Sequence, residues 1–224
     1  MKTFHSDFKE IGPIKFPVWT GIRIQMMPFV MHDMASLPPE LAHWLAALTT
    51  VMASCREIVG VGYLTIDERV VKAGETHRRP GLHVDGMGNW GGGSWGAKGM
   101  FMASGIPLNG NLKTPTCAAW RQDFIGSPLS GADPGDPMEG NCDHLRPQCL
   151  LGSRTLLKPD TVYWCDSMCV HESLPMPYSA RRTFVRVSMP SDCPWPANCT
   201  PNPCGIKPGG PIAEPRRTEA QYRY

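Results

Sequence analysis

The pattern of hydrophobic and polar residues predicts one amphipathic helix, at about residues 38 to 57. Hydrophobic residues recur there at three- and four-residue spacing, which places them on one face of a helix: Leu41, Trp44, Leu45, Leu48 and Met52. Ser36 and the prolines at 38 and 39 stand where such a helix would begin. His43 lies off this stripe, so we expect it to be exposed to solvent.

Outside this helix, hydrophobic residues occur in short runs separated by glycine, proline and polar residues. Such runs predict β-strands, here within residues 16–31, 58–66, 69–72, 82–84, 100–104, 155–157, 161–164 and 183–189. Many short strands with turn residues between them favour a barrel or a double-sheet jelly roll. In either architecture, inward-facing side chains from separate strands can converge on one site.

The length of 224 residues suits one domain that is large enough to bury a core. We predict that this domain spans residues 1–190. Proline and cysteine are frequent in residues 191–224, which disfavours regular structure. This last segment is therefore expected to be an extended strap or a disordered tail.

Charge and cysteine content limit the partners and the compartment. The formal net charge is only +2, so the basic surface of a dedicated nucleic-acid binder is not expected, while an anionic small substrate remains compatible. No long apolar segment or charged-then-apolar leader is evident, and the nine cysteines are an odd number. We expect a cytoplasmic protein with reduced thiols and no membrane segment.

Three residues far apart in the sequence form a candidate metal site. In an extended segment His83 and Asp85 share one face, because side chains alternate, and His171 follows in a second strand-like run. Two histidines and one carboxylate with open positions suit iron(II) in oxygenases. Taken singly, His83 and Asp85 could form a surface pair and His171 could be a buried, hydrogen-bonded histidine. His77 is a weaker rival ligand because Arg79, not a carboxylate, stands two residues later; it is expected to line the approach or cap a turn.

Two irregular segments and three tryptophans are candidates for the substrate side of this site. Residues 86–99 are rich in glycine and carry Trp90 and Trp95, so they are interpreted either as a lid over the metal or as a plain surface loop. Residues 123–148 form a second irregular insertion. Trp90, Trp95 and Trp164 are candidates for an apolar substrate wall, and His77 is a candidate for lining the approach to it.

Residues 157–175 carry a family resemblance. A Pro-Asp turn, an apolar strand, an Asp-Ser pair and then His171 before a Ser-Leu-Pro turn resemble the distal-histidine strand of iron(II)/2-oxoglutarate-dependent dioxygenases. The upstream His83-x-Asp85 pair and a trailing arginine complete the family's pattern. The resemblance covers about residues 58 to 190. It implies a double-stranded β-helix (jelly-roll) core, with iron(II) held by His83, Asp85 and His171.

The resemblance also implies a cosubstrate site on the last strand. Arg182 falls eleven residues after His171, a spacing similar to that of the phytanoyl-CoA-hydroxylase-like and taurine-dioxygenase-like branches, so it is expected to bind 2-oxoglutarate. Arg186 and Ser188 resemble the Arg-x-Ser pair of other branches, which makes Arg186 a second anchor or a substrate-facing cation. The implied reaction uses O2 to hydroxylate a C–H bond of a small molecule, and it releases succinate and CO2.

Two alternatives remain open at this point. One is a cupin-like metalloenzyme that does not use 2-oxoglutarate, in which neither Arg182 nor Arg186 would face the metal. The other is a non-catalytic binding domain, stapled by zinc through cysteines of the last strands and the tail: Cys165, Cys169, Cys193, Cys199 and Cys204. Neither the substrate nor the oligomeric state follows from the sequence.

Overall fold

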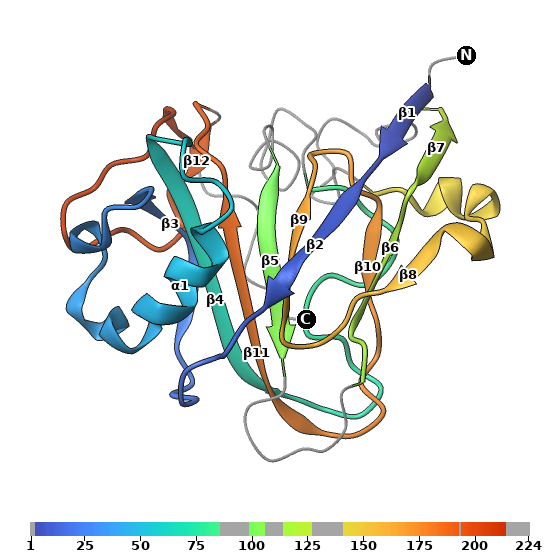
Figure 1. The fold of residues 1–224 in the computed structure, drawn as a ribbon, viewed down its shortest axis with the longest axis horizontal. Helices are drawn as coiled ribbons and strands as arrows, with labels where there is room; N and C mark the ends of the chain where they lie inside the picture. Colours follow the sequence, from blue (N-terminus) through green and yellow to red (C-terminus); the bar gives the residue numbers. More distant parts are fainter. Residues whose placement is uncertain (1–2, 86–98, 106–113, 127–140, 193, 214–224) are drawn as a thin grey trace.

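The structure is a computed structural model that describes residues 3–85, 99–105, 114–126, 141–192 and 194–213. Its main feature is a six-stranded antiparallel sheet with the strand order β2-β9-β5-β11-β4-β3 (Figure 1). The strands, in sheet order, are β2 (Phe8–Pro13), β9 (Thr161–Cys165), β5 (Met100–Gly105), β11 (Ala180–Ser188), β4 (Val61–Val71) and β3 (Arg23–Val30).

Smaller sheets accompany the large one. A three-stranded sheet has the order β10 (His171–Ser173), β6 (Cys117–Trp120) and β8 (Arg154–Leu156). Two pairs are formed by β1 (Thr3–Ser6) with β7 (Gln122–Ile125) and by β12 (Trp195–Pro196) with β13 (Ile212–Ala213). The described part is thus mainly antiparallel β-structure with one short α-helix. This agrees with the β-rich prediction, while the jelly-roll core remains part of the proposal made below.

The six-stranded sheet has two faces with different partners. On the face that we call outer, alternate residues of three neighbouring strands pack with the helical segment in one hydrophobic cluster: Leu64, Ile66, Phe101, Ala103, Val185 and Val187. On the inner face, Met102, Tyr163 and Phe184 pack with Ala119 of β6. The three-stranded sheet therefore covers the inner face, and the two sheets enclose a layer of side chains between them.

The predicted helix is shorter and less regular than its hydrophobic pattern suggested. It begins as a 3-10 helix, η2 (Pro39–Trp44), and continues as α1 (Leu45–Met52) instead of running from 38 to 57. Leu41, Trp44 and Leu48 of the predicted stripe are fully buried. The helix ends where the stripe ends, because the residues that follow Met52 are mostly exposed and have no core surface to cover. The other 3-10 segments of the described residues are η1 (Met34–Ser36), η4 (Asp143–Gln148) and η5 (Leu151–Ser153).

The strand predictions were correct in the centre of the sheet and incomplete elsewhere. The two strands predicted at 58–66 and 69–72 are one strand, β4, which spans Val61–Val71; its buried Asp67 and Glu68 interrupt the apolar pattern without ending the strand. Residues 82–84 make only an isolated bridge at His83 instead of a strand. The sequence did not predict β1, β2 or β6, and β7 and η4 lie within the insertion expected to be irregular.

The described part of the last segment lies along β3 and β4 as a strap. Trp195 is buried and its Nε1 donates to the Met26 carbonyl at 2.8 Å. Asn202 is also buried, and its Nδ2 lies 2.8 Å from the carbonyls of both Pro28 and Ser36. These bonds anchor a segment that has little regular structure of its own.

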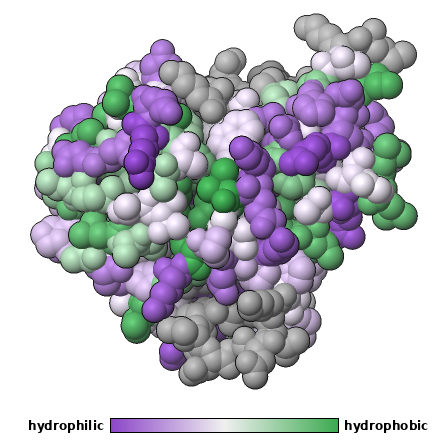
Figure 2. Space-filling model, viewed as in Figure 1, coloured by the Kyte–Doolittle hydropathy of each residue, from purple (hydrophilic) through white to green (hydrophobic). Residues whose placement is uncertain are grey.

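On the face of the molecule viewed in Figure 2, hydrophobic residues lie in small groups among hydrophilic ones. Scattered exposed hydrophobic residues are ordinary for a protein surface. Within the described residues, every helix is too short or too polar to cross a lipid bilayer.

Candidate metal centre

His83 and His171 are placed side by side by backbone pairing. The amide of each donates to the carbonyl of the other, at 2.9 Å and 3.0 Å, and their ring centroids are 4.3 Å apart. Leu82 and Val84 point the other way and are buried with Val170 in a separate hydrophobic cluster. The alternation predicted from the sequence therefore holds, even though this segment forms only one bridge.

The turn before His83 requires glycine. Gly81 has a φ of +74°, and a Cβ at this position would lie 2.8 Å from Asp143 Oδ2. Asp143 also accepts a hydrogen bond from the Leu82 amide at 3.0 Å. The tight turn therefore fixes where the His83 segment begins.

Both imidazoles are oriented by carbonyl groups. His83 Nδ1 lies 2.8 Å from the Gly81 carbonyl, and His171 Nδ1 lies 2.9 Å from the Cys169 carbonyl. Because a carbonyl can only accept, each Nδ1 carries the hydrogen, and the lone pair of each neutral ring is on Nε2. This is the arrangement by which proteins orient histidines that bind metals.

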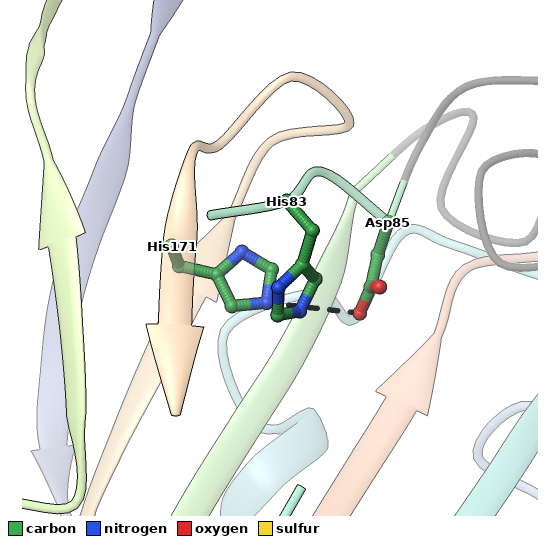
Figure 3. A group of neighbouring side chains, drawn as sticks. All are labelled: His83, Asp85 and His171. Carbon is green, nitrogen blue, oxygen red and sulfur yellow. Dashed lines mark ion pairs between the residues drawn. The ribbon is translucent and has the colours of Figure 1, made fainter. Parts of the chain in front are cut away.

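Asp85 completes the group, and Arg186 holds it. Figure 3 shows His83, Asp85 and His171 converging, and His171 Nε2 lies 3.8 Å from Asp85 Oδ2. Arg186 Nη1 donates to the same Oδ2 at 2.7 Å. Burial alone would raise the pKa of Asp85, but the charges of Arg186 and the histidines outweigh burial and hold this pKa well below its usual range. The carboxylate is therefore ionised, as a metal ligand must be.

The two histidines differ in their protonation. Burial and then the charge of His171 hold the pKa of His83 well below its usual value. Burial also opposes the charge on His171, but hydrogen bonding to Cys169 and the charge of Asp85 raise its pKa to about 8. Without metal at neutral pH, His171 therefore carries the proton and His83 is neutral, and a bound metal would displace the proton.

These residues fit a divalent metal. One potential donor atom from each of His83, Asp85 and His171 lies within 4.8 Å of the others, and this is the one such group of three found among the described residues. Two ligands about 2.1 Å from one ion lie at most about 4.2 Å apart, and the 3.8 Å between His171 and Asp85 is within that limit. The donor set, two nitrogens and one oxygen, leaves positions open for iron(II) to bind further molecules.

Arg182 lies on the inner face and is completely buried. Its Nη2 donates to the Thr116 hydroxyl at 2.6 Å and to the Ser104 hydroxyl. Its Nε and Nη1 have no hydrogen-bond partner among the described residues. Burial lowers the pKa of Arg182 to about 10, against the opposing charge of Asp160, so the side chain stays charged at neutral pH.

A second buried carboxylate lies on the inner face of β4. Asp67 is within 3.0 Å of Arg78, 3.5 Å of Arg69 and 3.6 Å of His77 Nε2. Arg78 also lies over the Phe184 ring, 4.9 Å from its centroid. His77 is buried, and neither ring nitrogen makes a hydrogen bond with a described residue. His77 thus belongs to this arginine-rich cluster and not to the group of three metal ligands.

The remaining predicted residues are dispersed. Ser188 is buried near the end of β11, beyond Arg186. Trp164 packs against the outer-face cluster, on the side of the sheet away from His83, Asp85 and His171, which we call the metal group. Its placement does not support a role in the substrate wall. Trp90 and Trp95, with the interpretation of residues 86–98 as a lid, lie outside the described residues. For the zinc alternative, Cys193 also lies outside them, and the described cysteines form no group of three within reach of one ion.

The sequence reasoning missed the residues that surround the two arginines. Thr116 and Ser104 lie in different segments, and local periodicity cannot bring them together at Arg182. Asp67 did carry a signal, because a carboxylate inside an otherwise buried strand requires a partner. Antiparallel pairing places Asp67 opposite Phe184, between the positions of Arg182 and Arg186.

No family model matches the sequence, and neither does any curated protein. Among solved structures, the chain is similar to a non-heme monooxygenase described as a ThoJ–Ni complex and to ThoJ apo, with 14% and 11% identity. Each similarity covers 78% of this chain, and the TM-scores are 0.34 and 0.35. The matches cover 62% and 64% of the ThoJ chains, so this chain spans less than two thirds of their length.

Proposed function

We propose that this chain is a non-haem iron(II) oxygenase that uses 2-oxoglutarate and O2 to oxidise a C–H bond of a small molecule. The supporting observation is the convergence of His83, Asp85 and His171, with both Nδ1 atoms held by carbonyls and the carboxylate kept ionised by Arg186. Three protein ligands leave room at an iron for a chelating cosubstrate and for O2. The β-rich fold is compatible with the jelly-roll core that the sequence resemblance implies.

Arg182 is proposed to bind the distal carboxylate of 2-oxoglutarate. Two of its nitrogens are buried without partners among the described residues, and such donors are costly to leave unmade. A carboxylate placed beside Nη1 would accept a hydrogen bond from it and balance the buried charge, while Thr116 and Ser104 hold Nη2. Arg186 is less suited to this role, because its Nη1 is already paired with Asp85.

The residues of the chain would hold the metal and orient the cosubstrate. When bound, iron(II) and 2-oxoglutarate supply the oxidising chemistry, in which O2 is consumed and succinate and CO2 are formed. His83, Asp85 and His171 would fix the metal, and Arg182 would fix the cosubstrate's orientation. The packed layer that contains Phe184 and Tyr163 excludes water from that side of the site.

The alternatives have less support. A cupin-like enzyme without 2-oxoglutarate predicts that neither arginine faces the metal group, whereas Arg186 contacts Asp85 directly. A zinc-stapled binding domain predicts clustered cysteines, and the described cysteines do not cluster in that way.

The test is anaerobic addition of iron(II) and 2-oxoglutarate, followed by optical spectroscopy. A weak visible charge-transfer band is expected in the wild type, should be absent in His171→Ala and should be weak in Arg182→Gln and Thr116→Val. His43→Ala is the matched control, because His43 is an exposed histidine on η2. A band that survives His171→Ala would refute the proposed site. Loss of the band in Arg186→Gln together with its retention in Arg182→Gln would assign the cosubstrate to the other arginine.

A further inference from the structure

Arg186 places a positive charge beside Asp85 of the metal group, and Arg78 places a second positive charge over the ring of Phe184 on the inner face. Arg78 is anchored by Asp67 at 3.0 Å, and Arg186 is anchored by Asp85 at 2.7 Å. The two guanidiniums are close enough for their charges to act on each other. Like charges held together in a partly buried place raise the free energy of the folded chain unless an anion lies near both.

The proposed cofactors do not remove this excess of positive charge. Among the described residues, four arginines act by their charge on the two carboxylates Asp67 and Asp85: Arg69, Arg78, Arg79 and Arg186. Glu75 acts on one of these arginines, Arg69. A divalent metal adds two positive charges and displaces one proton from His171, and 2-oxoglutarate adds two negative charges, so together they lower the positive charge by about one unit only. An anion bound near Arg78 and Arg186 would lower the repulsion between their charges.

The contacts indicate where that anion would bind. Arg186 Nε is buried without a hydrogen-bond partner among the described residues, and Arg186 Nη2 contacts only the weakly accepting Met26 sulfur at 3.0 Å. The Arg78 side chain is 27% exposed, so a molecule arriving from solvent can reach it. Arg182, in contrast, is completely buried and its hydroxyl partners orient it toward a different ligand.

We propose that the molecule oxidised by this protein carries an oxyanion group, a carboxylate or a tetrahedral anion such as a phosphate or sulfate ester, which Arg78 binds beside Phe184 with Arg186 as its neighbour. Planar guanidiniums match both kinds of oxyanion and bind them through paired hydrogen bonds. This inference rests on the proposed oxygenase function. It names the class of substrate and makes Arg78 a residue that determines specificity.

Thermal unfolding of the full chain, loaded anaerobically with iron(II) and 2-oxoglutarate, tests the site. Sodium sulfate and sodium acetate are titrated separately, with sodium chloride keeping the ionic strength constant. We expect a saturable rise in Tm in the wild type, and an affinity weaker by about tenfold or more in Arg78→Gln. Tighter binding of sulfate would assign a tetrahedral anion, and tighter binding of acetate would assign a carboxylate.

The matched control is Arg181→Gln. Arg181 is an exposed arginine of β11. It lies on the face of the strand opposite Arg186 and stacks on Trp19. Its anion affinity should equal that of the wild type. Equal affinity in Arg78→Gln, or the absence of saturable binding in the wild type, would overturn the proposal.

Further variants separate misfolding and cosubstrate effects from loss of the anion site. Arg78→Gln should retain the iron and 2-oxoglutarate band, which also shows that this variant is folded, and Arg182→Gln should show a weak band but retain anion binding. Arg78→Lys, which can still pair with Asp67, provides a second variant that should bind the anion more weakly than the wild type. Loss of the band in Arg78→Gln would assign Arg78 to the cosubstrate and overturn the inference. If the wild type shows no iron and 2-oxoglutarate band but binds the anion, and Arg78→Gln does not bind it, the oxygenase proposal is refuted and the anion site is not.

Discussion

The outer and inner faces of the six-stranded sheet are built from the same strands and serve different purposes. Along β11, Val185 and Val187 point outward into the hydrophobic cluster, while Arg182 and Arg186 point inward. On β4, Ile66 faces outward in the same way. Alternation along a strand thus places an apolar core and a charged site within one residue of each other.

The two faces differ in how the burial of their side chains changes the free energy of folding. Burying apolar side chains on the outer face stabilises the fold by about 25 cal/mol per Å². Burying the charges of Asp67, Asp85 and the arginines opposes folding unless each is paired. We infer that the outer face supplies the stability on which the inner face depends, and the following variants test this division.

The largest effect is expected from truncation on the outer face. Trp44 is completely buried in the hydrophobic cluster, so Trp44→Ala should destabilise the protein by about 3–5 kcal/mol through lost burial and a cavity. Denaturant unfolding measures this change. Iron affinity per folded molecule should be unchanged, and a large loss of affinity in the folded fraction would contradict the division between the faces.

The next effect concerns the ion pair beside the metal group. Asp85→Ala leaves the buried charge of Arg186 without its partner and should cost about 3 kcal/mol in the absence of metal. The double variant Asp85→Ala, Arg186→Met should recover most of that loss, because neither charge remains. A double-mutant cycle by denaturant unfolding tests this, and additive losses would show that the two charges do not interact.

Lowering the pH should destabilise the folded chain, because His77 is buried in its neutral form. Charged groups from several segments act on His77: Asp67 of β4, the neighbouring Arg78, and Arg182 of β11. The ring of Phe184, also of β11, packs edge-on against it. Burial lowers the pKa of His77 to about 4, against the opposing effect of Asp67. A lowered histidine pKa means that the unfolded chain binds the proton first, so stability falls as the pH drops from about 6.5 to about 4.

The expected loss from His77 is about 2 kcal/mol at pH 5 relative to pH 8. Asp67 does not contribute in this window, because its pKa is lowered and its effect begins only below about pH 3.8. In His77→Gln this part of the pH dependence should disappear. Unfolding curves at several pH values measure it, and an identical slope in His77→Gln would contradict the assignment.

The smallest effect is expected at an exposed position of β11. Arg181 stacks on Trp19, with its Cζ 4.7 Å from the ring centroid, and Arg181→Gln should cost at most about 1 kcal/mol. Denaturant unfolding should place it near the wild type. A cost as large as that of Trp44→Ala would mean that this edge of the sheet contributes to the core.

How much the sequence predicted depends on the range of the interactions involved. The inward direction of Arg182 and Arg186, and the shared direction of His83 and Asp85, follow from alternation and were predictable. The contact of Arg182 with Thr116 joins distant segments, and the contact of Arg78 with Asp67 joins β4 to the irregular segment after it, so the periodicity of one element contains neither. The same holds for the pairing of β1 with β7 and of β2 with β9, whose strands are far apart in the chain.

The last segment shows another limit of local patterns. Its prolines correctly indicated little regular structure, but not whether the chain would be bound to the domain. Buried hydrogen bonds of Trp195 and Asn202 to β3 and η1 decide this in the structure. Such bonds depend on the three-dimensional position of single polar groups, which composition does not encode.

The most direct test of the central claim is an anaerobic calorimetric titration of the metal-free chain with iron(II). We expect one iron per chain in the wild type, and in His77→Gln as well, because His77 belongs to the Asp67 cluster. In His83→Ala and His171→Ala the affinity should fall by about a hundredfold or more, since each variant removes one of three ligands. Wild-type affinity in His171→Ala, or loss of binding in His77→Gln, would contradict the central claim.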